Sequence, residues 1–401
     1  MLFKDIPLGL HFLEVRTSVV KNSFKKSFAV FLSMVLLILL IAQVAPVFTS
    51  KYKKIPIFSQ EFVMGKVLSI DENNLAEDPY VEGRYNGNQK FTVLIQEGAQ
   101  QGKEFSIYNT LTSMKSAFAY EGLEAIFTIR TAIDGTTSVW LYNYRRDKAL
   151  YVLALFLVII VLLIGRKEGL NSLLALAFTA TVLLYIVVPM MWSPHPILVA
   201  IISSIVICLI SFLLIAGWTR KAIVASIGTL LGISLAGIMC YGFGRMLNLS
   251  GVDMNKGESL LYLAQDKNFK IKSLLFVSIL ISSLGATMDI AMSIASSGTQ
   301  IVRTNPDLSN KELFVILINV GKDIIGTMTN TLILAFCGAS LPLAMLIWGY
   351  DMTYMQFINI PIIVIDILQA LSGSIGMVTS VIFTAVAFVL LPKKGEKNEI
   401  Y

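Results

Sequence analysis

Ionisable side chains stand in the middle of two long apolar segments of this chain. Asp289 interrupts the first segment, and Lys322 with Asp323 interrupts the second, residues 313–335. Residues three or four apart share a face of an α-helix, so each acid gathers polar or small companions beside it. The companions are Ser278, Ser282, Gly285, Ser293, Ser296 and Gln300 in the first segment and Asn319, Gly326, Thr327 and Asn330 in the second. Because charge is costly at bilayer depth, the two faces predict a site that binds a solute or an ion, or relays protons.

The composition indicates an integral membrane protein. Of the 401 residues, 55% are hydrophobic and 14% are charged. A helix needs about 20 apolar residues to cross a hydrocarbon core of roughly 30 Å. Eight segments reach or approach that length: residues 28–48, 150–164, 170–191, 197–217, 223–243, 274–294, 313–343 and 375–391. We therefore predict a polytopic α-helical membrane protein with about eight transmembrane helices.

Basic residues predict the orientation of these spans. If all eight cross, one side of the membrane receives Lys21, Lys25, Lys26, Arg166, Lys167, Arg220, Lys221, Arg303, Lys311, Lys393, Lys394 and Lys397. The positive-inside rule places that side, with both termini, in the cytoplasm of a bacterial cell. One loop, residues 246–271, departs from the positive-inside rule, since its three lysines would lie outside. The net charge of +6 is explained by topology, so the lipid bilayer is a predicted partner and nucleic acid is not.

The predicted spans divide the chain into five regions. A basic cytoplasmic N-terminus covers residues 1–26, a transmembrane anchor residues 27–48, and an extracytoplasmic domain residues 49–148. A multi-span helical domain (149–392) and a cytoplasmic tail (393–401) follow. We interpret the first span as an anchor rather than a cleaved signal peptide, because its apolar run is long and no small-x-small cleavage site follows it.

The extracytoplasmic region reads as β-structure. Runs rich in β-branched and aromatic residues alternate with turn signals such as Gly87-Asn88, which predicts strands at residues 62–70, 90–96, 104–108, 124–130 and 137–142. Five strands in about 100 residues suggest a small barrel, similar to an OB-fold. The string GAQQGK at residues 98–103 lacks the spacing and the Ser/Thr of a phosphate-binding loop, so we predict a hairpin turn there.

No motif of a known catalyst or metal centre occurs. The sequence contains no HExxH, GxSxG or Walker string, so we predict no enzyme and no cofactor. The three cysteines, Cys208, Cys240 and Cys337, all fall within predicted spans, and the histidines are limited to His11 and His195. Neither a disulfide in the exterior region nor a zinc site is expected.

The span at residues 223–243 carries a face with little side-chain bulk. Its small residues recur every four positions, at Gly228, Gly232, Ala236, Cys240 and Gly244. Such spacing lets another helix backbone approach closely. Packing within the chain and contact with another subunit both fit the pattern.

A segment before the last span is harder to place. Asp366 and Gln369 interrupt an apolar run that begins at Pro361, and residues 370–374 separate that run from the last span. If residues 353–371 also crossed the membrane, the C-terminal lysines would lie outside, against the positive-inside rule. We therefore expect a re-entrant or interfacial helix there.

Two strings in the spans around the ionisable residues resemble a known family. LGATMDIAMS (284–293) and GKDIIGTMTNTLILA (321–335) are similar to the two characteristic motifs of the YibE/YibF family of bacterial membrane proteins. VLSI (67–70) and QEGAQQGK (96–103) resemble the exterior domain of its longer, YibE-like members. The resemblance implies the anchor, the β-rich domain and the multi-span region, with a shorter YibF-like paralogue or self-association as partner. Met288 stands where relatives tend to carry a second acid, which argues against paired carboxylates on that span.

The first functional hypothesis is a permease or exporter. Lys322 and Asp323 lie near the middle of their span, where transporter sites concentrate. Asp289, Lys322 and Asp323 would bind a solute or relay protons, and Asn319, Thr327, Asn330, Ser282 and Ser293 would supply uncharged ligands. We expect the two polar spans to pack side by side, with Asp289 within salt-bridge reach of Lys322 or joined to it by one water, because pairing offsets the cost of a buried charge.

The alternative is a non-catalytic component of the membrane, such as a scaffold, an assembly factor or a sensor. Its exterior domain would bind a partner in the cell envelope. Asp289 and Lys322 would then only neutralise each other, and the polar faces would serve as hydrogen-bonding contacts between helices.

Overall fold

The structure is a computed structural model that describes residues 33, 35–45, 47, 60–113, 117–131, 136–254, 257–264 and 270–391. The chain divides into two compact units. One is Lys54–Leu163, and the other combines Met1–Lys53 with Ile164–Tyr401. The predicted N-terminal region 1–26 and tail 393–401 lie outside the described residues.

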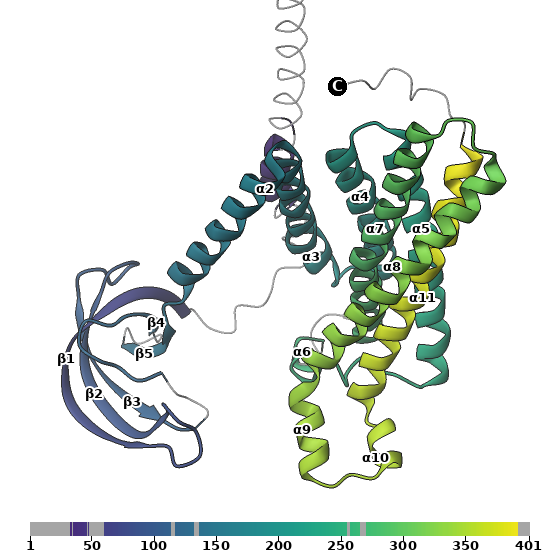
Figure 1. Ribbon diagram of the computed structural model, residues 1–401. Helices are drawn as coiled ribbons and strands as arrows, with labels where there is room; N and C mark the ends of the chain where they lie inside the picture. Colours follow the sequence, from purple (N-terminus) through teal and green to yellow (C-terminus); the bar gives the residue numbers. More distant parts are fainter. Residues whose placement is uncertain are drawn as a thin grey trace, which may run out of the picture. The chain divides into compact units, whose positions relative to one another are not determined.

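The first unit contains a five-stranded antiparallel sheet, coloured purple to blue in Figure 1. Its strands are β1 (Gln60–Glu77), β2 (Tyr85–Ile95), β3 (Glu104–Leu111), β4 (Glu124–Thr131) and β5 (Thr137–Tyr144). All five strands predicted from the sequence are present. Their order is β3-β2-β1-β4-β5, and β3 also contacts β5 across the ends of that order. The sheet therefore curls on itself (Figure 1).

Alternation of side chains produces the core of this sheet. Val63 and Val67 on β1, Phe91 and Val93 on β2, and Phe127 on β4 are almost completely buried, as period-2 patterning requires for a sheet with one packed face. Residues 98–102 form the predicted hairpin turn between β2 and β3. Gly98 and Gly102 adopt φ of 83° and 80°, and the Gly102 N–H donates to the Ile95 carbonyl at 2.9 Å.

Helix α2 (Asp147–Val182) joins two segments that the sequence predicts as separate spans, residues 150–164 and 170–191. Arg166 interrupts it with φ 45° and ψ −119°. A short π-helix, η2 (Leu183–Val187), and α3 (Val188–Met190) continue to a total of 44 residues. At 1.5 Å per residue, that length is more than twice the thickness of a hydrocarbon core. The break at Arg166 is therefore the point at which this run can turn back.

The second unit is a helical bundle. Its elements are α4 (Pro196–Ala216), α5 (Arg220–Met246), α6 (Gly257–Ala264), α7 (Ile271–Thr304), α8 (Asn310–Ala339), α9 (Leu341–Gly349), α10 (Tyr354–Ile358) and α11 (Pro361–Leu390). Local signals set several starts, since Thr219 caps α5 and Ser309 with Glu312 forms a capping box at α8. Pro196 and Pro361 occupy first-turn positions, where their missing N–H costs nothing.

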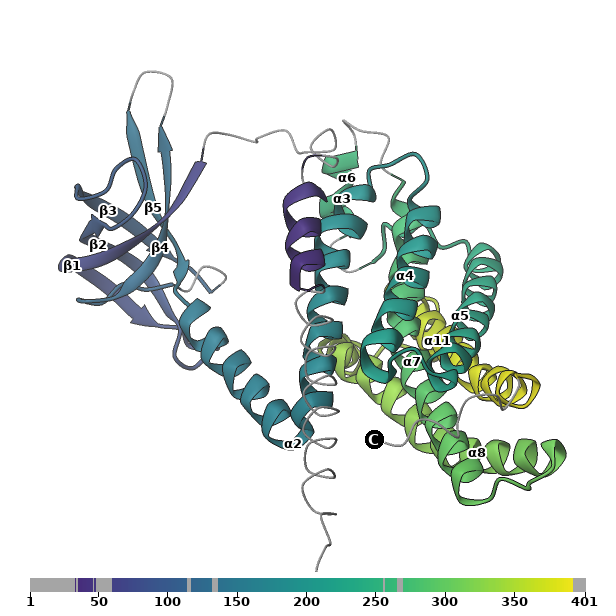
Figure 2. The same cartoon turned by 90° about the horizontal axis from the view of Figure 1, so that it is seen from above.

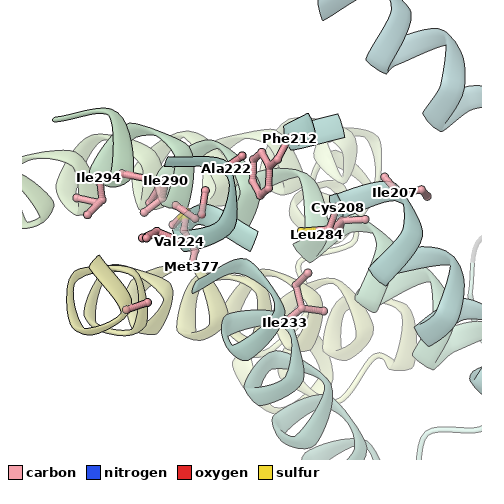
Figure 3. Close-up of a cluster of buried hydrophobic side chains, with 14 of the residues drawn as sticks. Ile207, Cys208, Phe212, Ala222, Val224, Ile233, Leu284, Ile290, Ile294 and Met377 are labelled. Atoms are coloured by element: carbon pink, nitrogen blue, oxygen red, sulfur yellow. The ribbon is translucent and has the colours of Figure 1, made fainter. Parts of the chain in front are cut away.

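Apolar side chains from four of these helices meet in the centre of the bundle. Figure 3 shows part of this core, with Ile207 and Phe212 from α4, Val224 and Ile233 from α5, Leu284 and Ile290 from α7, and Met377 from α11. Helix α11 contacts α5, α7 and α8, while α4 contacts α5 and α7. This arrangement leaves one face of α8 outside the core.

Within the described residues, five helices are long and apolar enough to cross a membrane. They are the run from α2 to α3, then α4, α5, α7 and α11. Helices α8 and α9 form a sixth if they count as one span, although they meet at an angle of 60°. Residues Val35–Ala45 form a shorter apolar helix within the predicted anchor. The chain is therefore a helical membrane protein with a separate antiparallel sheet.

The prediction of a helix break at residues 370–374 is wrong. Helix α11 runs without interruption from Pro361 to Leu390, so residues 361–371 belong to the last long helix and not to a separate re-entrant or interfacial one. The small residues at the expected break are packing positions. A Cβ on Gly373 would lie 3.3 Å from Ser283 Oγ and 3.4 Å from Leu332 Cδ2. Small side chains thus allow α7 and α8 to approach α11 closely at this point.

The small-residue face of α5 packs against α11. A Cβ on Gly228 would overlap Thr384, and a Cβ on Gly232 would lie 2.6 Å from the Gly376 carbonyl oxygen. Ala236 is completely buried, Cys240 belongs to a cluster with Ile365 and Leu368, and Gly244 faces Leu368. In this structure the face is occupied from within the chain.

Candidate functional site on helices α7 and α8

Helices α7 and α8 contact each other (Figures 1 and 2). Leu313, Leu317 and Gly321 form the buried face of α8. Gly321 is pressed against Val381 of α11, and a Cβ at this position would lie 3.4 Å from Ile294 of α7. Where Gly321 faces Ile294, the two polar spans therefore meet through groups without charge.

The opposite face of α8 is polar and exposed. Asn319, Lys322, Asp323, Thr327 and Asn330 all lie on it with exposed side chains. Gly326 belongs to the same face, and a Cβ there would meet no atom within 4 Å. This face, together with the matching face of α7, is called the α7–α8 polar face below.

On α7, Asp289 and Gln300 are exposed, while Ser282 and Ser293 are partly buried. The serine hydroxyls are satisfied locally. Ser282 donates to the Ile279 carbonyl at 3.0 Å and Ser293 to the Asp289 carbonyl at 2.8 Å. Ser282 also accepts from Gln369 Nε2 of α11 at 2.9 Å. The polar contacts of these serines therefore also support the helices themselves.

The charged groups of the α7–α8 polar face have no charged partner among the described residues. Lys322 Nζ lies 3.4 Å from Asn319 Oδ1 of its own helix. In the part of the chain that the structure describes, no carboxylate lies within 4.0 Å of Lys322 Nζ, and no basic group lies within 4.0 Å of Asp289 or Asp323. The expected direct pair between Asp289 and Lys322 is thus not formed. The physical reason is that the helices meet through Gly321 and Ile294, which turns both charged faces outward.

The structure also brings together two polar residues that the sequence does not pair. Ser340, at the bend between α8 and α9, donates its hydroxyl to Asp366 Oδ2 of α11. In the sequence, Asp366 interrupts one apolar run and a Ser-Leu-Pro string interrupts another. Nothing in the sequence shows that these two positions meet. Elsewhere, Arg220 donates to the Leu391 carbonyl at 2.9 Å and stacks 4.3 Å from the Phe388 ring centroid, which ties the start of α5 to the end of α11.

Comparison with known proteins identifies the family. A family model described as "YibE/F-like protein" matches residues 153–394, which is more than half of the chain. The chain belongs to the YibE/F-like family. No curated protein and no solved structure matches it. The family match extends from α2 to the end of α11 and includes both motif strings of the α7–α8 polar face.

The sheet lies outside the matched part of this YibE/F-like protein. Its resemblance to the longer family members therefore stays a prediction. Among the described residues, no three His, Cys, Asp or Glu side chains gather in a way that could hold a metal ion. The candidate site of the YibE/F-like protein is accordingly a set of charged and amide side chains on two neighbouring helices.

Proposed function

We propose that this chain is a subunit of a permease or exporter for a small solute, and that the α7–α8 polar face forms part of its path. The observation that carries the proposal is the exposure of Asp289, Lys322 and Asp323 on apolar helices, without a charged partner among the residues that the structure describes. A charge at the bilayer centre costs at least about 2.5 to 3.5 kcal/mol. Contact with lipid would therefore destabilise these charges, whereas a water-filled path between helices would solvate them.

A second polypeptide completes this path. Gly285 and Gly326 present open space where a Cβ would meet nothing within 4 Å, so another helix backbone can come close. A second copy of the chain and a shorter YibF-like paralogue are the two candidates.

Within the path, the side chains have separate roles. Asp289 and Asp323 bind a cation or carry a proton, and Lys322 balances their charge or holds an anionic group of the solute. Asn319, Thr327, Asn330, Ser282 and Ser293 supply uncharged hydrogen-bonding groups. The bend between α8 and α9 supports this function, since interrupted helices are a recurring feature of secondary transporters.

The topology belongs to the same proposal. Eight crossings of a bacterial cell membrane, with both termini cytoplasmic, result when each half of α2 crosses separately and α8 with α9 counts as one span. The sheet then lies outside the cytoplasm. Its strand order, in which β1 pairs with both β2 and β4 and β3 approaches β5, supports an OB-like barrel.

A scaffold or sensor is the second candidate function. It is favoured by aromatic side chains on the outside of the sheet. Phe62 and Tyr142 are both more than half exposed and their rings stack edge to face at 5.0 Å. Exposed aromatic pairs of this kind are suited to binding a partner, which in this case would belong to the cell envelope.

The substitution Asp289→Asn separates the two functions. It keeps the shape and a hydrogen-bonding tip but removes the titratable charge. We expect proton flux into proteoliposomes, followed with a trapped pH-sensitive dye under a clamped potential, to fall to the level of protein-free vesicles. The melting temperature should stay near that of the parent, because Asp289 has no ion pair to lose. Asp351→Asn in the loop after α9 is the control with unchanged flux.

Two results would speak for the scaffold instead. One is the absence of flux in the parent protein. The other is a loss of stability in Asp289→Asn that Lys322→Met restores, since that pattern identifies a pair whose role is neutralisation.

A further inference from the structure

A cavity opens where α8 ends, away from the α7–α8 polar face. Its volume is about 290 Å³, close to the lower end of the range for small-molecule sites. Side chains from α8, α9, α10 and α11 line it, among them Phe336, Cys337, Ser340, Phe357, Asp366 and Ala370. Most of the lining is apolar.

The electrostatics of this cavity favour a positive charge. Asp366 is the acid in its wall, and no basic side chain lies within 4.0 Å of it among the described residues. A cation in the cavity would meet that carboxylate.

Ser340 orients the Asp366 carboxylate towards such a ligand. Its hydroxyl donates to Oδ2 of Asp366 and fixes the orientation of the carboxyl group. The other oxygen, Oδ1, is not engaged by this bond and can accept from a ligand. Because Ser340 is also the residue at which α8 bends by 60° into α9, an occupant would contact both sides of the bend.

The lining selects the class of cation. A bare metal ion of the Ca²⁺ type takes six to eight oxygen ligands, and Mg²⁺ requires an octahedral set, whereas this wall offers one carboxylate and one hydroxyl. Phe336 and Phe357 instead suit an ammonium group that carries apolar substituents, through cation–π and apolar contact. We propose that this cavity binds an organic cation with apolar groups, whose charged nitrogen lies beside Asp366. Binding here does not depend on the proposed permease function.

The test uses the full chain purified in detergent and benzyltrimethylammonium as the probe, with titration calorimetry as the readout. Saturable binding is expected for the parent. Asp366→Asn should weaken the affinity about tenfold or more, because the substituted side chain keeps its size and loses its charge. Asp351→Asn, in the nearby loop and outside this cavity, is the control with unchanged affinity. The neutral carbon isostere neopentylbenzene should bind more weakly than the cation and be indifferent to Asp366→Asn.

A second variant tests the proposal independently if Asp366→Asn fails to fold. Ala344→Phe keeps Asp366 and fills the cavity from α9, so it should also abolish binding of the cation. The proposal is overturned if the parent shows no saturable binding, if a folded Asp366→Asn protein binds the cation as tightly as the parent, or if Ala344→Phe leaves the affinity unchanged.

Discussion

Gly232→Leu is expected to lower the melting temperature of the purified chain by about 5 °C or more. A Cβ at this position would lie 2.6 Å from the Gly376 carbonyl oxygen, 2.8 Å from Thr287 and 2.9 Å from Ser380. Two different helices, α7 and α11, thus confine the site, and one of the obstructing atoms belongs to the backbone. Because no flexible side chain can swing away to make room, α5 would have to move.

The measurement is thermal unfolding followed with a thiol-reactive dye, which reports exposure of the buried Cys208 and Cys240. Gly242→Leu is the matched control on the same helix, since nothing lies within 4 Å of a Cβ there. We expect that control to unfold within about 1 °C of the parent. Equal melting temperatures for the two variants would show that this face of α5 does not pack against α11.

Reversing the charge of Lys322 is expected to disrupt association between copies of the chain. The α7–α8 polar face carries both signs, with Lys322 and Asp323 on α8 and Asp289 on α7. In a two-fold dimer, each lysine can meet a carboxylate of the other copy. Lys322→Asp leaves only acids on this face, which should raise the dissociation constant by about 100-fold or more, since an unpaired buried charge costs about 3 to 5 kcal/mol.

The double variant Lys322→Asp with Asp323→Lys exchanges the two charges and should recover much of the lost affinity. Photobleaching steps of labelled chains in lipid bilayers give the dissociation constant. Lys311→Asp makes the same change at the start of α8, outside the apolar part of the helix, and should leave association unaltered. A parent that stays monomeric, or a charge exchange that fails to restore association, would favour the shorter YibF-like paralogue as the partner.

The strands and most helices could be predicted because each depends on a local pattern. Runs rich in β-branched and aromatic residues between turn signals predicted β2 and β3, and a long apolar run that begins at Leu313 predicted α8. The same logic failed at residues 370–374. Small and polar residues mark a loop when they face water, but here Ser372 is buried and Gly373 faces α7 and α8. Sequence alone does not distinguish the two situations.

The polar face was predictable on each helix separately, and its pairing was not. Helical periodicity places Asn319, Asp323 and Asn330 on one side of α8 whatever surrounds it. Which side meets α7 depends on the packing of Gly321 against Val381 and Ile294, a contact among three helices that no local pattern encodes. The contact between Ser340 and Asp366 could not be predicted from the sequence for the same reason.

Access of water to the α7–α8 polar face is the most direct test of the proposed path. Single cysteines replace Asn319, Thr327 or Leu231 in a protein without its three native cysteines, and a membrane-impermeant thiol reagent is added to proteoliposomes. Leu231 is an exposed apolar residue of α5 and serves as the lipid-facing control. We predict that the cysteines at Asn319 and Thr327 are labelled and that the cysteine at Leu231 is not. Equal protection of all three positions would contradict a hydrated path along this face.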